Sequence, residues 1–149
     1  MSDKTSENIE LVKFVIFNID QKVYALPGNM VREIIIGYKV YYLPFIPGYI
    51  RGLINRHGEP YTVVDIKVLF EQERLEAEKY IIIRDETDKL ALIITEISKI
   101  VNIDQKEIHP ITSHSEGGDF FNNSISIEGV EIPILEIESV IRKIKHDIK

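Results

Sequence analysis

Short apolar runs rich in isoleucine and valine, most of them ended by glycine, proline, asparagine or aspartate, recur along the chain. β-branched side chains lose rotamer freedom in helices and pack well on pleated strands. Many short strands joined by tight turns are typical of small closed or partly closed barrels. No run approaches the roughly 18–20 apolar residues that a membrane-spanning helix needs, so we expect no direct membrane insertion. The pattern predicts a mainly β protein.

The predicted elements fall into two sets, separated by the charged segment 71–78, which we expect to be a surface linker with some helical character. Strands are predicted over 14–19, 22–26, 31–36, 38–42, 53–55 and 61–64 in the first set, and over 80–84, 90–95, 97–103, 124–128 and 130–134 in the second. Residues 65–70 predict one helical turn. A terminal helix is predicted from apolar residues spaced three and four apart, namely Ile137, Val140, Ile141, Ile144 and Ile148.

The net charge of -6 argues against a nucleic-acid partner, because such binding depends mainly on cationic side chains that face phosphates. The absence of cysteine excludes disulfides, thiolate zinc sites and a cysteine nucleophile. Residues 1–10 are polar and acidic, unlike a secretory signal, so we expect a cytoplasmic protein.

Signatures of catalysis are missing: the sequence contains no phosphate-binding glycine loop, no HExxH and no GxSxG. His109, His114, Glu116 and Asp119 could in principle hold a metal, but their spacing fits no standard site. Ser113, His114 and Asp119 share one polar loop, 113–119, which we expect to be flexible, whereas a catalytic triad needs a base locked by packing. We therefore expect no enzyme activity, cofactor or metal; a small ligand-binding or metal-binding barrel remains the less favoured alternative.

The stretch from 43 to 52 is unusually apolar for a segment with two prolines and two glycines. Its large side chains either plug a barrel or form a docking groove, because large exposed apolar patches usually mark partners. We expect about half of these side chains to be buried. They are Leu43, Phe45, Ile46, Tyr49 and Ile50.

Residues 43–66 also carry an ordered motif: leucine-proline, a second proline, an aromatic residue, G-h-h-N, a turn glycine, and a hydrophobic run that ends in Asp-hydrophobic. The positions are Leu43, Pro44, Pro47, Tyr49, Gly52, Asn55, Gly58, Val63, Val64, Asp65 and Ile66. With the strand motif at 14–17 and the V-x-E-I step at 31–34, this order resembles the CheW chemotaxis coupling family. The resemblance covers about residues 13–144.

The resemblance implies two intertwined five-stranded SH3-like barrels that share a hydrophobic core, with a C-terminal helix. Residues 1–12 are then expected to be a flexible tail, and 13–149 the CheW-like domain with its two barrel lobes. It implies a non-catalytic adaptor that couples chemoreceptors to the histidine kinase CheA, at receptor arrays on the inner face of the membrane. The receptor's cytoplasmic tip is expected in a groove between the barrels, and the regulatory domain of CheA at the barrel ends. An adaptor of a pilus or other non-flagellar pathway is the alternative.

The resemblance also implies residue roles. The expected receptor-binding groove comprises Val31, Glu33, Ile34, Phe45, Ile50, Arg56 and His57. Glu33 is either a polar receptor contact or a solvent-facing strand residue. His57 stands where the family has an arginine, and it offers fewer donors and a charge that varies near neutral pH. We therefore predict weaker, pH-dependent receptor coupling at this position unless Arg56 substitutes for the missing arginine.

The remaining motif residues are expected to shape the backbone. Gly52, Asn55 and Gly58 are predicted in turns, and Asp65 is predicted to cap the helical turn that follows it. Pro44 and Pro47 are predicted to fix the loop shape at low entropic cost.

Overall fold

Two antiparallel-rich sheets and a C-terminal helix make up the fold, in a computed structural model that describes residues 9–111 and 118–148. The six-stranded sheet has the order β8-β1-β2-β11-β10-β9 and the five-stranded sheet the order β3-β6-β7-β5-β4. The strands are β1 Leu11–Ile19, β2 Lys22–Pro27, β3 Val31–Ile36, β4 Ile50–Arg56, β5 Glu59–Val64, β6 Lys79–Ile83, β7 Leu90–Ile94, β8 Glu96–Asp104, β9 Ile108–Pro110, β10 Phe121–Ile127 and β11 Val130–Leu135. The α-helices are α2 Ile66–Leu69 and α3 Ile137–Ile148, and short 3-10 turns occur at Gly28–Met30, Gln105–Glu107 and Gly118–Phe120.

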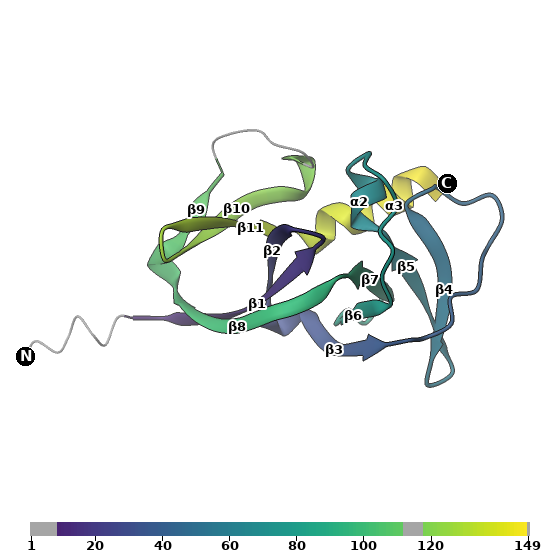
Figure 1. The fold of residues 1–149 in the computed structure, drawn as a ribbon, viewed down its shortest axis with the longest axis horizontal. Helices are drawn as coiled ribbons and strands as arrows, with labels where there is room; N and C mark the ends of the chain where they lie inside the picture. The colour runs from purple at the N-terminus through teal and green to yellow at the C-terminus, as the bar shows by residue number, and fades with distance from the viewer. Residues whose placement is uncertain (1–8, 112–117, 149) are drawn as a thin grey trace, which may run out of the picture.

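The chain passes between the two lobes twice, because β1 and β2 build the first sheet, β3 to β7 the second, and β8 to β11 return to the first (Figure 1). The mainly β architecture in two lobes with a terminal helix is therefore confirmed. The first sheet has six strands rather than five, because short β9 adds to β10. β1 begins at Leu11, so it takes in two residues of the predicted tail.

The strand predicted over 38–42 is wrong. Gly37 has a φ of 76° and ends β3, and only Tyr41 pairs afterwards, in a single bridge to Leu53. The linker 71–78 is not helical in the structure. Its Leu75 is 1% exposed and belongs to the core, so an apolar side chain anchors this otherwise polar segment.

One large hydrophobic cluster spans both lobes and the C-terminal helix. It includes Phe17 and Leu26 from the six-stranded sheet, Ile54 and Leu92 from the five-stranded sheet, and Val140 from α3. A smaller cluster lies within the six-stranded lobe and consists of Phe14, Ile16, Ala25, Ile125 and Ile132. The predicted apolar face of α3 is buried at Ile137, Val140 and Ile141, whereas Ile148 at the end of the helix is 55% exposed.

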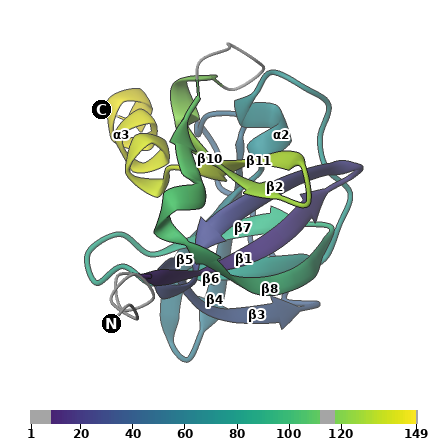
Figure 2. The same ribbon diagram turned by 90° about the vertical axis from the view of Figure 1, so that its left-hand side faces the viewer.

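The two lobes contact each other between β1 of the six-stranded sheet and β7 of the five-stranded sheet. β8 is one edge of the six-stranded sheet and β3 one edge of the five-stranded sheet, and Figure 2 draws β8 just above β3. Each exposes an apolar side chain, Ile100 on β8 (61%) and Ile34 on β3 (38%).

Candidate functional site

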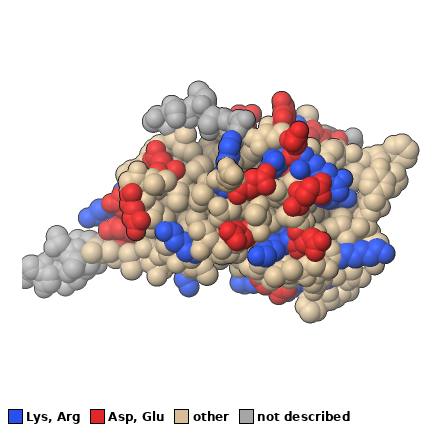
Figure 3. Space-filling view, in the orientation of Figure 1, with Lys and Arg blue, Asp and Glu red and all other residues tan. Residues whose placement is uncertain are grey.

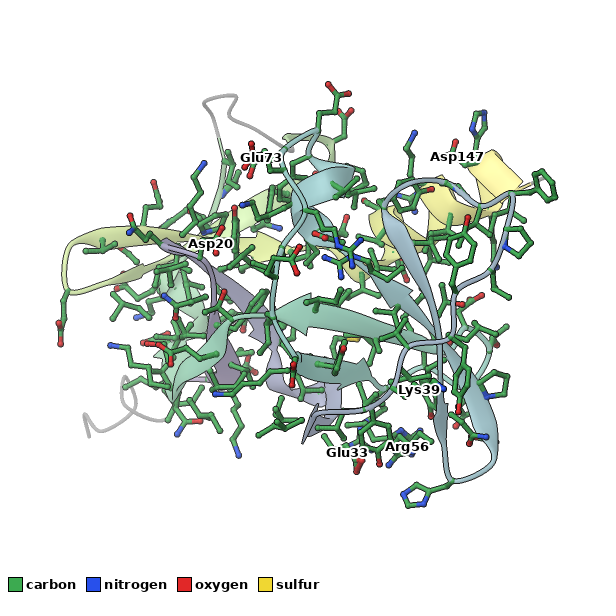
Figure 4. The ribbon with its side chains drawn as sticks, turned by 45° about the vertical axis from the view of Figure 1, so that its right-hand side comes forward. Asp20, Glu33, Lys39, Arg56, Glu73 and Asp147 are labelled. Atoms are coloured by element: carbon green, nitrogen blue, oxygen red, sulfur yellow. The ribbon has the colours of Figure 1, made fainter. Side chains whose placement is uncertain are left out.

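An ion pair joins the two edge strands of the five-stranded sheet. Arg56 at the end of β4 donates from Nε to Glu33 Oε2 at 2.7 Å and from Nη2 to Glu33 Oε1 at 2.8 Å. β3 and β4 lie at opposite edges of the strand order, so this contact links the edges through side chains (Figure 4). Bidentate pairing of this kind is shorter and more directional than neutral hydrogen bonding.

The electrostatics follow from that geometry. The hydrogen bonds from Arg56 hold the pKa of Glu33 below its usual value, and Glu33 in turn raises the pKa of the Arg56 guanidinium. Arg56 also faces Tyr61, whose hydroxyl lies 3.5 Å from Nη1. The guanidinium is thus directed at groups of its own chain, and Glu33 is neither unpaired nor simply solvent-facing.

His57 lies at the tip of the hairpin between β4 and β5. His57 and Gly58 have φ values of 54° and 81°, which a tight two-residue hairpin turn with positive φ at both positions requires. The turn is supported by Asn55, whose Oδ1 accepts from Gly58 N at 2.9 Å. The His57 side chain is exposed, so it occupies the outward position beside the ion pair.

The segment 37–49, which we call the aromatic loop, connects β3 to β4. Phe45 is fully exposed with a φ of 60°, and Tyr42 is 78% exposed. A bulky residue rarely adopts this left-handed backbone conformation. The upper part of the right-hand end in Figure 3, where Figure 1 draws this loop, is formed by uncharged residues.

The base of the aromatic loop is fixed to β4. Tyr41 and Leu53 exchange two backbone hydrogen bonds, at 2.7 and 2.9 Å. Position 52, next to Leu53, accommodates only glycine. Gly52 has a φ of 141°, and a Cβ at this position would lie 2.1 Å from Tyr41 O. Lys39 Nζ lies 4.8 Å from the centroid of the Tyr41 ring. Pro47 O accepts from Ile50 N at 3.0 Å, whereas Pro44 lies exposed beside Phe45.

Asp65 has a larger role than the predicted cap. Its Oδ1 accepts from Lys67 N and Val68 N at the start of α2. Its Oδ2 accepts from Arg51 Nη2 at 2.8 Å and from Leu75 N at 2.9 Å. Arg51 also donates to Leu75 O, so this fully buried carboxylate fastens the linker 71–78 to β4.

The structure separates the residues that were predicted to form one receptor-binding groove. Val31, Glu33 and Ile34 lie on β3, with Arg56 across from them and His57 next to it. Phe45 projects from the aromatic loop instead. Ile50 begins β4 with its side chain in the core, only 5% exposed, so its side chain offers a partner little surface.

Sequence reasoning missed the pairing of Glu33 with Arg56 and the exposure of Tyr42 and Ile100. Glu33 and Arg56 are 23 positions apart, so no local sequence pattern predicts that they pair. Ile100 could have been found from its strand, since it stands next to Val101 and adjacent residues of a strand point to opposite faces.

The residues considered for metal binding do not converge in the described part of the chain. His109 lies on β9, where its Nε2 is 4.0 Å from Glu107, and Asp119 lies in the 3-10 turn before β10. Ser113, His114 and Glu116 fall outside the described residues. Among residues 9–111 and 118–148, no group of three or more His, Asp or Glu could hold a metal ion. Nor is any helix in those ranges both long and apolar enough to cross a membrane.

Two β lobes around one core carry a bidentate ion pair and exposed aromatic side chains on the outside, which are groups that protein-binding surfaces commonly use. The family model described as the CheW-like domain matches residues 13–145. The chain belongs to this CheW-like family, whose curated relatives are chemotaxis proteins.

Individual relatives agree with the family. The chain is 25% identical to the chemotaxis protein CheW of Helicobacter pylori over 149 residues, which cover 94% of this chain and 87% of the relative. It is 23% identical to the chemotaxis protein CheW of Treponema pallidum over 108 residues, 68% of this chain and 64% of that one. The crystal structure of the scaffolding protein TtCheW from Thermoanaerobacter tengcongensis matches with a TM-score of 0.78 and 23% identity, covering 85% of this chain and 90% of that chain.

Proposed function

We propose that this protein couples chemoreceptors to the histidine kinase CheA, in the cytoplasm beside receptor arrays, by binding each partner on its own surface. One observation carries the proposal: the exposed contact groups are divided between the Glu33–Arg56 pair and the aromatic loop. An adaptor that holds two partners at once needs surfaces that do not overlap.

The receptor's helical tip is assigned to the surface along β3. Ile34 and Ile100 offer apolar contacts from the two lobes, and Glu33, Arg56 and His57 offer polar ones. A helix docks in such a place by laying its apolar face on the exposed isoleucines. Val31 is half-buried beneath this surface and supports it.

The regulatory domain of CheA is assigned to the aromatic loop. Exposed aromatic side chains are the commonest anchors of protein interfaces, because they bury much area at little entropic cost. Phe45 and Tyr42 are such side chains, and Pro44 and Pro47 limit the freedom of the segment that carries them. This assignment moves Phe45 from the receptor groove to the kinase-binding surface.

The test is a pair of calorimetric titrations, with a receptor-tip fragment and with the isolated regulatory domain of CheA. Phe45→Ala is expected to weaken binding of the kinase domain at least about tenfold, as a lost interface anchor does, and to leave receptor binding within about twofold. Ile34→Asp is expected to have the opposite pattern.

Val130→Ser serves as the matched control, because Val130 is 59% exposed on β11 and lies outside both assigned surfaces. Modular interfaces of this kind are often micromolar. Absence of binding to either partner at tens of micromolar contradicts the proposed coupling. Equal loss of both partners in every variant contradicts the division into two surfaces.

A further inference from the structure

The far end of the aromatic loop is tied to the C-terminal helix. Tyr49 is only 7% exposed, and its hydroxyl donates to Asp147 Oδ2 at 2.8 Å. The same hydroxyl lies 3.5 Å from Lys143 O. Asp147 belongs to the last turn of α3, and Figure 4 draws it beside the segment that leads into β4.

The Asp147 carboxylate is a strong acceptor. It accepts a hydrogen bond from the Tyr49 hydroxyl, and Lys143 Nζ lies 3.1 Å and His146 Nδ1 3.2 Å from its oxygens. These contacts, that of Tyr49 foremost, lower the pKa of Asp147 to about 2, and burial followed by the bond to Asp147 raises the pKa of Tyr49. The contact is therefore a charge-assisted hydrogen bond from a neutral phenol to an ionised carboxylate throughout the neutral range.

Both ends of the projecting part of the loop are thus fixed. At one end Tyr41 is bonded to Leu53. At the other, Tyr49 holds Asp147 through its side chain and accepts from Asp65 N at 2.7 Å through its carbonyl. Residues 42–48 project between these points with Phe45 fully exposed. A contact segment that is already ordered loses less entropy when it binds.

We propose that Asp147 is a positioning residue for partner binding: through Tyr49 it holds the aromatic loop in the conformation that presents Phe45. The inference rests on the proposed function for the identity of the partner, but the link between α3 and the loop does not depend on it. The C-terminal helix, through its contact with Tyr49 at the end of the aromatic loop, then controls the affinity of the kinase-binding surface.

The first test concerns the loop alone. The chain contains no tryptophan, so Phe45→Trp supplies a single fluorescent reporter at the apex. In this background Asp147→Ala and Tyr49→Phe are expected to lower the tryptophan anisotropy and to speed amide hydrogen exchange over 42–48. Asp147→Asn keeps an oxygen acceptor and is expected to stay near the parent. Unchanged exchange and anisotropy in both Asp147→Ala and Tyr49→Phe overturn the proposal.

The second test concerns binding, in the protein that keeps Phe45. Asp147→Ala and Tyr49→Phe are each expected to weaken the regulatory domain of CheA by about five- to tenfold, as losing preorganisation does, with receptor-tip binding unchanged. Lys143→Ala is the control, because it removes another partner of Asp147 and leaves the Tyr49 contact intact. Thermal melting shows that each variant is folded at the temperature used.

The outcomes separate the two hypotheses. If the parent protein fails to bind the kinase domain, the proposed function fails, and the fluorescence and exchange data still decide the positioning role. If the parent binds and the folded Asp147→Ala and Tyr49→Phe variants bind equally well, the positioning role fails. A loss as large in Lys143→Ala as in Asp147→Ala also contradicts it.

Discussion

The two lobes bury polar groups in different ways. The five-stranded lobe buries the Asp65 carboxylate and pairs it with Arg51, which holds a linker against the sheet. The six-stranded lobe instead buries the neutral side chain of Ser124, whose hydroxyl donates to Glu131 at 2.8 Å. The five-stranded lobe also supplies most of the large core and carries the ion pair and the aromatic loop. Most of the assigned contact groups therefore lie on the lobe that supplies most of the large core, with Ile100 on β8 contributed by the other lobe.

The largest expected effect tests this difference in packing directly. Ile54 and Ile125 are both fully buried, the first in the large cluster and the second in the small one. Truncation to alanine leaves a cavity whose cost depends on how far the surroundings collapse, so we expect a loss of about 4 kcal/mol for Ile54→Ala and about 2–3 kcal/mol for Ile125→Ala.

Urea unfolding at neutral pH measures both losses on the same scale. Ile54→Val and Ile125→Val are the conservative controls and are expected to cost only about 0.5–1.5 kcal/mol each. An equal or larger loss for Ile125→Ala shows that the six-stranded lobe is packed as tightly as its neighbour.

Removing the buried carboxylate is the next largest effect. Asp65→Ala removes the carboxylate that accepts from Arg51 and from the amides of Lys67 and Leu75. Removing one partner of a buried ion pair typically lowers the free energy of unfolding by about 3–5 kcal/mol. We expect about 3 kcal/mol, since Arg51 is 14% exposed and can still reach water.

Asp65→Asn keeps one oxygen for the helix cap and is expected to lose less. Ser124→Ala is the counterpart in the other lobe, expected at about 1 kcal/mol for a neutral hydrogen bond. Urea unfolding compares the three variants, and a loss below that of Ser124→Ala for Asp65→Ala contradicts the structural importance of the buried pair.

Local chemistry made much of the fold predictable from the sequence. Asn55, Gly58 and Asp65 each act on backbone groups within three residues, so their spacing already indicated a turn and a cap. The β-branched runs likewise indicated strands, because burial on a pleated surface is periodic along the chain. The strand over 38–42 was predicted because its tyrosines have β propensity. The prediction was wrong because the chain turns away from the sheet after Gly37.

The contacts that matter for function were not predictable in this way. Glu33 meets Arg56 because two edge strands of one barrel approach each other, and Tyr49 meets Asp147 across 98 positions. Neither pairing leaves a periodic trace. Burial of Ile50 also depends on which face of β4 packs inward, and the register slips between Ile50 and Gly52. A one-residue change of register reverses the face of every later side chain.

A smaller effect is expected at the tip of the β4–β5 hairpin. His57→Arg introduces the guanidinium that the resemblance to the family implies at this position, and under the proposed receptor contact we expect receptor-tip affinity to rise about three- to tenfold at pH 8. Arg56 does not make the change redundant, because its guanidinium is bonded to Glu33.

Gln21→Arg is the control for this variant, since it adds the same charge to an exposed turn of the other lobe. Titration calorimetry at pH 6, 7 and 8 gives the affinities. Unchanged receptor affinity for His57→Arg across that range contradicts a receptor contact at this turn, and an equal gain in Gln21→Arg reduces the effect to net charge.

The smallest expected effect is in the titration of Glu33, which links the two edges of the five-stranded sheet through Arg56. Its pKa in the folded protein lies below the ordinary 4.5, chiefly because Arg56 bonds the ionised form. Between the folded pKa and the ordinary pKa of 4.5, the unfolded chain binds more protons than the folded chain. The stabilisation is therefore present above pH 4.5 and is lost as pH falls through the lower, folded pKa.

Carboxyl carbon chemical shifts measured by NMR follow the titration of Glu33, and Arg56→Gln is expected to move its midpoint upward. Lys89→Gln removes a half-buried cation that precedes β7 and pairs with Glu59, and it is expected to leave the midpoint in place. A midpoint at or above 4.5 in the parent protein means that the two edges are not joined by this pair in solution.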